Sequence, residues 1–373
     1  MIFASDNWAG ASSQVIDALA AAAVSGHPAY GADDITKAVE RRFSELFERD
    51  VTVLLVASGT VANALSLSAY ARPGGVVFCH RHAHIVVDEA GATTFFGGGI
   101  TLTPLDGDSG KFSPAPLAAA LDAMKDHVPH TGQAVAVSIT ELTELGALYR
   151  LDEVRAIANV AHAHGCAVHM DGARFANAVA ALGVSPAAIT WRAGVDVLSF
   201  GGTKNGCIAA EAVVFFDPAP VRDAVFQRQR AGQGFSKNWF IAAQFDAYLR
   251  DNHWLDLAGH SNAMAARLAG AISASGNGRL ALAPDGNEIF AVLSKAADAR
   301  LRAAGAVYYP WAAETLPAEA RPGPDEVAVR LICGWQTRPD EVDGFAAVLA
   351  DKQATAESLR LTVAGRRNSN TPI

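Results

Sequence analysis

A lysine between glycines has the clearest chemical potential in this sequence. Lys204 lies in the segment 200–206, which reads FGGTKNG. A lysine that loses its proton in apolar or cationic surroundings becomes a nucleophile that forms imines with carbonyl compounds. Glycines on both sides would let a bulky ligand approach the backbone. A solvated loop lysine is the alternative interpretation of this segment taken alone.

A carboxylate and an arginine stand close together in the segment 169–174, which reads HMDGAR. Asp171 could pair with the protonated nitrogen of a pyridine ring, which would keep the ring charged and make it a better electron sink. Arg174 could hold an anionic oxygen. The alternative is a local salt bridge between these two residues, three positions apart at the start of a helix.

The segment 57–63, ASGTVAN, has the character of a phosphate loop. Ser58, Gly59 and Thr60 stand between a predicted strand and a predicted helix, where backbone N–H groups and hydroxyl groups can surround an anion. An ordinary serine-capped helix is the alternative. The glycine and lysine spacing of a Walker loop or a dinucleotide-binding fingerprint is absent.

Two further residues could contact a ligand. His84 could stack on an aromatic ring or relay a proton, although it could also be a surface histidine like its neighbours. No carboxylate or cysteine pattern completes a metal site around these histidines, so we expect no metal. Arg330 lies in an apolar strand pattern, where its planar fork would suit a substrate carboxylate. The alternative is an edge-strand arginine that points to water.

The elements that must position these residues alternate along the first two thirds of the chain. Helical patterns occupy residues 61–71 and 151–164. Short apolar runs predict strands at residues 51–56, 75–79, 134–139, 166–170, 195–200 and 212–216. This alternation predicts an α/β fold with a mainly parallel central sheet. Ligands in such sheets bind at the carboxyl ends of strands, where Asp171 and Lys204 both fall.

The pattern changes after about residue 235. Helices are predicted at 239–249, 254–274 and 340–351, with short strands at 289–293, 305–309 and 327–332. We therefore expect a large domain at 1–245, a smaller C-terminal α+β domain at 246–352, and a disordered polar tail at 353–373.

The composition of the 373 residues is that of a soluble globular protein. Half of the residues are hydrophobic and the formal net charge is −8, which argues against a nucleic-acid surface. No signal peptide or membrane span is expected. The four cysteines form no C-x-x-C pair, which fits a reducing cytoplasm better than a disulfide framework.

The order of these motifs resembles that of the low-specificity L-threonine aldolases, pyridoxal-phosphate (PLP) enzymes of fold type I, the aspartate-aminotransferase fold. The resemblance extends from about residue 3 to residue 349. Its most specific stretches are ASDN at 4–7, AYGADD at 29–34, residues 169–177 and residues 200–206. It implies cleavage of L-threonine, L-allo-threonine and related β-hydroxy-α-amino acids to glycine and an aldehyde.

The resemblance also implies roles for individual residues. Lys204 would bind PLP covalently, Asp171 would pair with its ring nitrogen, and His84 would stack on the ring. Lys237 would reach a phosphate from a neighbouring subunit of a homotetramer. The residues expected to contact the cofactor are Ser58, Gly59, Thr60, His84, Asp171, Arg174, Thr203, Lys204 and Lys237. Those expected to contact the substrate are Ser5, Tyr30 and Arg330.

One departure leaves the general base open. Another branch of the family carries a histidine at the end of a Glu-Asn-Thr-His stretch, and Glu144 stands at that position here. The base is either Glu144, or His84 acting through a water. Two other functions stay open: another PLP reaction, either β-elimination or racemisation, and a non-catalytic PLP-binding protein. The sequence does not determine the threo or erythro preference or the preferred aldehyde.

Overall fold

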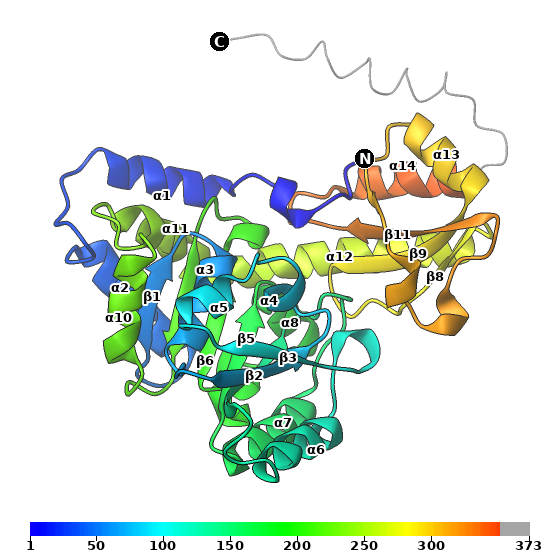
Figure 1. Ribbon diagram of the computed structural model, residues 1–373. Coiled ribbons are helices and arrows are strands. Elements are labelled where there is room, and N and C mark those ends of the chain that lie inside the picture. The colour runs from blue at the N-terminus through cyan, green and yellow to red at the C-terminus, as the bar shows by residue number, and fades with distance from the viewer. Residues whose placement is uncertain (351–373) are drawn as a thin grey trace. The chain divides into compact units, whose positions relative to one another are not determined.

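Figure 1 shows the computed structural model, which describes residues 1–350. A seven-stranded sheet forms the centre of the larger of two units, Ala9–His260. Its strand order is β1-β7-β6-β5-β4-β2-β3. The strands are β1 (Thr52–Val56), β2 (Gly75–His80), β3 (Thr101–Leu105), β4 (Gln133–Thr140), β5 (Ala167–Gly172), β6 (Val197–Gly201) and β7 (Glu211–Phe215).

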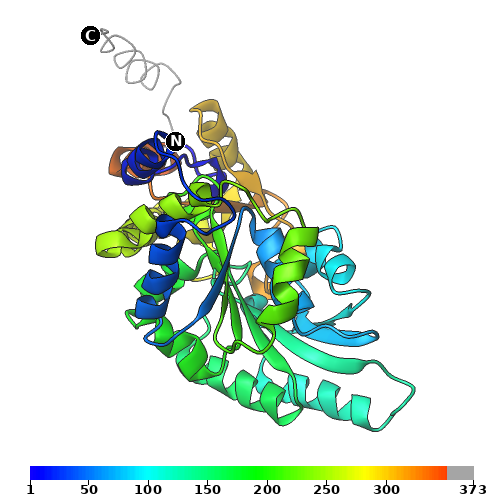
Figure 2. The same cartoon turned by 90° about the vertical axis from the view of Figure 1, so that its left-hand side faces the viewer.

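All strands of this sheet except β7 run in one direction. Strands β6, β5, β4, β2 and β3 pair in parallel, whereas β7 is antiparallel to both β6 and β1. Because β7 is antiparallel to both of its neighbours, β1 runs in the same direction as β6. The carboxyl ends of six strands therefore lie at the same edge of the sheet, and Figure 2 shows the twist that these strands share.

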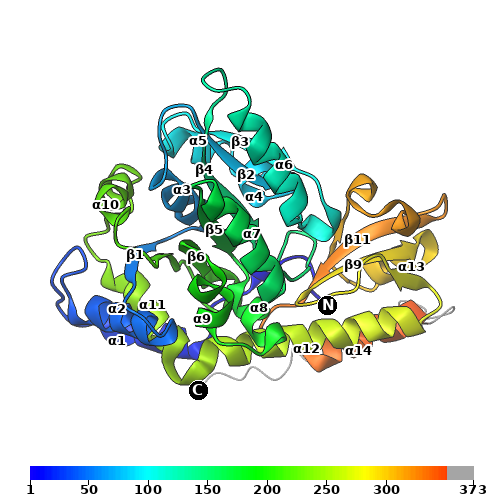
Figure 3. The ribbon, with the colours of Figure 1, turned by 90° about the horizontal axis from the view of Figure 1, so that it is seen from below.

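Helices cover both faces of the sheet because alternate residues of each strand pack to opposite sides. On β6, Val197 packs with Leu65 of α3, whereas Leu198 belongs to the core that contains Phe43 of α2. Figure 3 shows α10 and α2 on opposite sides of β1. The helices are α1 (Ser13–Ala23), α2 (Asp34–Leu46), α3 (Gly59–Ser68), α4 (His84–Val87), α5 (Ala92–Phe96), α6 (Pro114–Lys125), α7 (Leu151–Ala163), α8 (Phe175–Leu182), α9 (Pro186–Ile189), α10 (Val221–Arg230), α11 (Trp239–Leu249) and α12 (His253–Ala274).

An aromatic cluster anchors the chain immediately before the candidate lysine. Phe200, on β6, is fully buried. Its ring centroid lies 5.2 Å from that of Phe43 and 5.6 Å from that of Trp254. The pair with Phe43 is edge-to-face, an arrangement that stabilises a core beyond the burial of its area. The turn that follows β6 therefore begins next to a residue whose position is fixed by packing.

Gly201 is required by backbone packing at the end of β6. A Cβ atom placed there would lie 2.7 Å from the carbonyl oxygen of Ala173. We expect Gly201→Ala to destabilise the protein by about 1–3 kcal/mol, the range for overpacked sites. Gly259→Ala is the matched control, because a Cβ on that α12 residue meets no atom within 4 Å, and alanine there should stabilise the helix by up to about 1 kcal/mol. Thermal unfolding of both variants tests this, and a G201A protein as stable as the wild type would contradict it.

The smaller unit contains Met1–Trp8 together with the described residues from Ser261 onward. Its antiparallel sheet has the order β10-β11-β9-β8. Phe3 is buried in its core, donates a backbone hydrogen bond to Val307 and accepts one from Ile332. The strands and helices confined to this unit are β8 (Gly278–Leu280), β9 (Glu288–Ser294), β10 (Tyr309–Pro310), β11 (Glu326–Ile332), α13 (Lys295–Ala303) and α14 (Pro339–Ala350).

The α/β fold with a mainly parallel sheet is confirmed, and so are its six predicted strands. Strand β3 was not predicted, because it is an edge strand with mostly exposed or half-buried residues and contains Pro104. The short strand β8 was also not predicted. Of the strand expected at 305–309, only Tyr309 lies in a strand, as the first residue of the two-residue β10.

The division into units differs from the predicted boundary between residues 245 and 246. That boundary falls inside α11, whereas the observed division follows His260, within the continuous helix α12. The first eight residues belong to the smaller unit because Phe3 is packed into its core. The tail predicted to be disordered at 353–373 lies outside the described residues. Within residues 1–350, no helix combines the length and apolar character needed to cross a membrane.

Candidate active site

Five predicted site residues follow the carboxyl ends of five different strands of the larger unit. They are Ser58 after β1, His84 after β2, Glu144 after β4, Asp171 at the end of β5 and Lys204 after β6. Because these strands share one direction, the chain brings all five residues to the same edge of the sheet.

The predicted phosphate loop is the start of α3. Ser58 has an extended backbone, with φ −146°, and its hydroxyl oxygen accepts a hydrogen bond from the backbone N–H of Val61 at 3.4 Å. A Cβ built at Gly59 meets no atom within 4 Å, so there is space beside the helix start. The first turn of a ten-residue helix presents N–H groups and the positive end of the helix dipole, which suit a phosphate.

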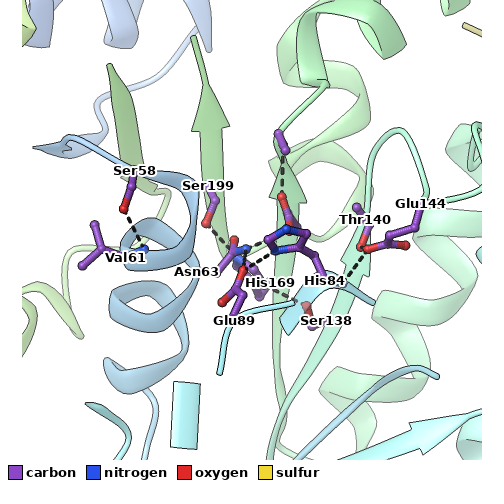
Figure 4. A network of polar contacts seen from close by, with 12 residues as sticks. Ser58, Val61, Asn63, His84, Glu89, Ser138, Thr140, Glu144, His169 and Ser199 are labelled. Carbon is purple, nitrogen blue, oxygen red and sulfur yellow. Dashed lines mark hydrogen bonds and ion pairs between the residues drawn. The ribbon is translucent and has the colours of Figure 1, made fainter. Parts of the chain in front are cut away.

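Asp171 is buried and held by two donors. The side-chain amide of Asn63 donates to its Oδ2 at 2.8 Å, and the backbone N–H of Ala173 donates to its Oδ1 at 3.0 Å. Asn63 also donates to Oε1 of Glu89 at 2.8 Å. Figure 4 shows Asn63 and Glu89 beside His84. Asp171 therefore belongs to a fixed network of polar side chains.

His84 is bound to the same network. Its Nδ1 lies 2.8 Å from Oε1 of Glu89, whose side chain is fully buried, whereas the His84 side chain is 39% exposed. The hydrogen bond to Glu89 raises the pKa of His84 above its ordinary value. Burial in turn raises the pKa of Glu89. The imidazole is thus a base whose protonated form is stabilised by a buried acid.

Glu144 lies on the other side of His84 in Figure 4. Its Oε1 accepts hydrogen bonds from the backbone N–H of His84 at 2.8 Å and from the hydroxyl of Thr140 at 2.9 Å. Its Oε2 is buried and has no hydrogen-bond partner among the described residues. Burial, followed by the charge of Asp171, raises the pKa of Glu144 to about 7. A carboxyl group with this pKa can exchange a proton near neutral pH.

Lys204 lies in a short turn, η4 (Thr203–Asn205), directly after β6. The backbone N–H of Thr203 donates to Oε1 of Glu211 at 3.3 Å. Glu211 is the first residue of β7, and the antiparallel direction of β7 brings it to the edge where the other strands end. Burial raises the pKa of Glu211 to about 7, and the charge of Lys204 opposes that rise.

The packing of the backbone itself requires two of the glycines around Lys204. Cβ atoms on Gly201 and Gly202 would lie 2.7 Å from the carbonyl oxygen of Ala173 and 2.8 Å from that of Ala210. These two glycines therefore allow the strand end and its turn to pack closely against neighbouring backbone.

The other predicted residues of the larger unit lie in less buried places. Tyr30 is 68% exposed and Lys237 is exposed. Their loops lie next to each other, because the backbone N–H of Tyr30 donates to the carbonyl oxygen of Ser236 at 3.0 Å. Arg174 is half-buried at the start of α8.

Ser5 and Arg330 belong to the smaller unit. Arg330 lies on β11, which pairs with β10 on one side and β9 on the other, so the edge-strand alternative is wrong. Its guanidinium carbon lies 5.0 Å from the ring centroid of Trp311 and 5.9 Å from that of Tyr309. Its Nε is buried and has no hydrogen-bond partner within the described part of the chain. Aromatic rings thus hold this arginine in place.

Sequence reasoning missed four polar residues of this region. Three of them are Asn63, Glu89 and Glu211, and the fourth is His169. His169 is fully buried on β5, within hydrogen-bonding distance of the Ser138 hydroxyl at 2.9 Å and the Ser199 hydroxyl at 3.0 Å. Burial lowers the pKa of His169 to about 4, so the ring is neutral at physiological pH. Asn63 carried a usable signal, because it stands one helical turn after the predicted phosphate loop.

The fold is fold type I of the PLP-dependent enzymes. The structure of a Leishmania major threonine aldolase matches 93% of this chain and 98% of its own, with a TM-score of 0.85 and 28% identity. A structure of Oryza sativa TDC with PLP and tryptamine covers 94% of this chain and 84% of its own, with a TM-score of 0.70, but at 12% identity it supports the fold alone.

Sequence comparison identifies the family. The family model described as beta-eliminating lyase matches residues 3–295. The low specificity L-threonine aldolase of Pseudomonas aeruginosa is 37% identical over 344 residues, which cover 92% of this chain and 95% of that protein. The chain belongs to the beta-eliminating lyase family and, within it, to the low-specificity L-threonine aldolases, which confirms the resemblance seen in its motifs.

Proposed function

We propose that this protein is a PLP-dependent carbon–carbon lyase that cleaves L-threonine, L-allo-threonine and related β-hydroxy-α-amino acids, such as phenylserine, to glycine and an aldehyde. The observation that carries this proposal is the 37% identity to the P. aeruginosa low specificity L-threonine aldolase over nearly the full length of both chains. The arrangement of acids and bases at one edge of the sheet supports it. β-Elimination, racemisation and a non-catalytic role are not favoured.

The residues at the carboxyl edge of the larger sheet fit PLP. Ser58, Gly59 and Thr60 would hold its phosphate at the start of α3, and Arg174 would lie near its phenolic oxygen. Asp171 can only accept hydrogen bonds when ionised, so it suits a protonated ring nitrogen. Lys204 would supply the amine that binds the cofactor, with Thr203 beside it. Bound PLP supplies an electron sink for the electron pair of the bond that breaks.

Either Glu144 or His84 would remove the proton from the substrate's β-hydroxyl oxygen. Glu144 has a buried oxygen, Oε2, without a partner among the described residues, and it can bind a proton near pH 7. His84 is more exposed and could act through a water. Because the backbone of His84 donates to Glu144, the two candidate bases lie side by side.

The pH dependence of cleavage should distinguish these two bases. If Glu144 is the base, activity should rise as the pH increases through about 7, because only the ionised carboxylate accepts a proton. Glu144→Gln should then lower kcat by about 10²–10⁴-fold, whereas His84→Asn should keep an acidic limb near pH 7. If His84 is the base, E144Q should keep the acidic limb and H84N should remove it. Profiles in which neither variant changes this limb would reject both residues.

The substrate carboxylate would be bound by Ser5 and Arg330. The guanidinium group of Arg330 is planar and matches a carboxylate with two parallel hydrogen bonds. Its stacking on Trp311 fixes its orientation. Tyr30 would contribute from its exposed loop.

We also infer a cytoplasmic homotetramer. All four cysteines are free and buried, which is in keeping with a reducing compartment. Tyr30 and Lys237 lie on two exposed loops joined by a backbone hydrogen bond, as expected if both reach toward a neighbouring subunit. Light scattering of the purified protein would measure the assembly.

Product analysis tests the proposed reaction. With L-threonine, the holoenzyme should release glycine and acetaldehyde in equal amounts, and phenylserine should release glycine and benzaldehyde. Release of 2-oxobutyrate and ammonia from threonine would instead indicate β-elimination, and inversion at Cα without cleavage would indicate racemisation. A protein that binds PLP but converts none of these amino acids would be a non-catalytic binder.

A further inference from the structure

A buried amide joins two carboxylates at the edge of the larger sheet. Asn63 is 2% exposed, and its Nδ2 donates one hydrogen bond to Asp171 and one to Glu89, both at 2.8 Å. An amide nitrogen carries two N–H groups, so both are used. Because buried like charges repel, a donor between them is needed to keep the two acids close.

Glu89 connects this amide to His84. The oxygen of Glu89 that accepts from Asn63 is also the one that lies 2.8 Å from Nδ1 of His84. The second oxygen of Glu89 is buried and has no hydrogen-bond partner among the described residues. A carboxylate bound to one imidazole nitrogen fixes the ring orientation and leaves the other nitrogen, here Nε2, to face a ligand.

We propose that Glu89 and Asn63 are positioning residues of this site: Glu89 fixes the ring and tautomer of His84, and Asn63 ties Glu89 to Asp171. This inference rests on the proposed function, which gives His84 and Asp171 their contacts with the cofactor. The backbone of His84 is held separately by Glu144. His84 is therefore held in place both at its backbone and at its imidazole ring.

The charges around His84 determine whether the loss of Glu89 raises or lowers the pKa of its imidazole. Glu89 and Asp171 favour its protonated form, whereas Lys204 opposes it. Glu144 lies at the His84 backbone, on the side away from Glu89. Since the hydrogen bond to Glu89 is the largest influence on His84, its loss should lower the pKa of the imidazole.

The first test is the variant Glu89→Gln, which keeps the size of the side chain and removes its charge. The matched control is Asp88→Asn, which removes the same charge from the exposed neighbouring residue. The rate at which diethyl pyrocarbonate modifies His84, followed by peptide mass spectrometry across pH, reports the neutral imidazole in the full-length protein without cofactor. We expect E89Q to lower the pKa of His84 by about 1 unit or more, and D88N to leave it unchanged.

The second test uses Asn63→Leu, which removes both hydrogen bonds at once. This variant should shift the His84 pKa and also weaken PLP binding by about tenfold or more, the scale of a lost hydrogen bond to a charged group. E89Q keeps an acceptor for Asn63 and should change PLP binding much less. Equal losses of PLP affinity in N63L and E89Q would overturn the separate roles given to the two residues.

The wild-type protein provides a test that does not depend on the folding of a variant. Its His84 should titrate above the ordinary value of about 6.5. A wild-type His84 that titrates at or below this value, or a folded E89Q protein with an unchanged His84 pKa, would overturn the positioning role of Glu89. These outcomes are distinct from a failure of the proposed function, which would be the absence of glycine from threonine in a protein whose His84 still titrates high.

Discussion

Lys204→Ala is expected to remove covalent PLP binding and reduce threonine cleavage by on the order of 10³-fold or more, the scale of losing a group that takes part in proton transfer. The physical reason is the position of Lys204. It lies in η4 directly after β6, and the preceding Phe200 is fixed by the aromatic core. Alanine at this position has no amine with which to bind the cofactor.

The control for this variant is Lys125→Ala, which removes an exposed lysine from the last turn of α6. The K125A protein should keep the yellow colour and the activity of the wild type, and the K204A protein should lose both while its thermal unfolding stays close to that of the wild type. A K204A protein that still binds PLP covalently and cleaves threonine at the wild-type rate would exclude Lys204 from the site.

The second large effect is expected from Asp171→Asn. Asp171 accepts hydrogen bonds from Asn63 on one oxygen and from the backbone of Ala173 on the other. Asparagine has only one acceptor oxygen, so one of these contacts must be lost, and the buried negative charge that would face the ring nitrogen disappears as well. Breaking a buried charge pair costs about 3–5 kcal/mol. We therefore expect kcat/KM to fall by about 10²–10³-fold or more.

An exposed aspartate provides the comparison for D171N. Asp152 lies in the first turn of α7, and Asp152→Asn removes one negative charge at the surface. Steady-state kinetics and PLP titration should show little change in D152N and a loss of both activity and PLP affinity in D171N. Wild-type kinetics in a folded D171N protein would mean that the carboxylate has no electronic role.

Much of the large unit was predictable because its strands are continuous apolar runs. β6 is buried along all five residues, and its sequence has no competing helical period. The residues that follow such strands were therefore predictable as neighbours at one edge of the sheet. This reasoning found Asp171 and Lys204, and His84 and Glu144 follow β2 and β4 in the same way.

The hydrogen-bond partners of these residues were not predictable, for geometric reasons. Glu89 stands five positions after His84, which is not a neighbouring position on a helix. The two residues meet because α4 ends at Val87 and the backbone leaves the helical conformation at Asp88, with φ −128°, directly before Glu89. Glu211 lies at the edge where the other strands end because β7 runs antiparallel to β6. The number of residues between the two strands does not reveal that direction.

The domain boundary was not predictable for a similar reason. Composition changes near residue 235, but the division follows packing, and α12 continues through it without a break. The N-terminal residues join the smaller unit through pairings with Val307 and Ile332, which are distant in sequence. Contacts over such separations leave no local periodic signal.

Reduction of the holoenzyme with borohydride, followed by peptide mass spectrometry, shows whether PLP is bound at the carboxyl edge of the larger sheet through Lys204. The predicted result is a single pyridoxyl group on the peptide that contains Lys204, with loss of threonine cleavage in proportion to the labelling. A pyridoxyl group on any other lysine, or full cleavage activity without one, would exclude Lys204 as the residue that binds PLP.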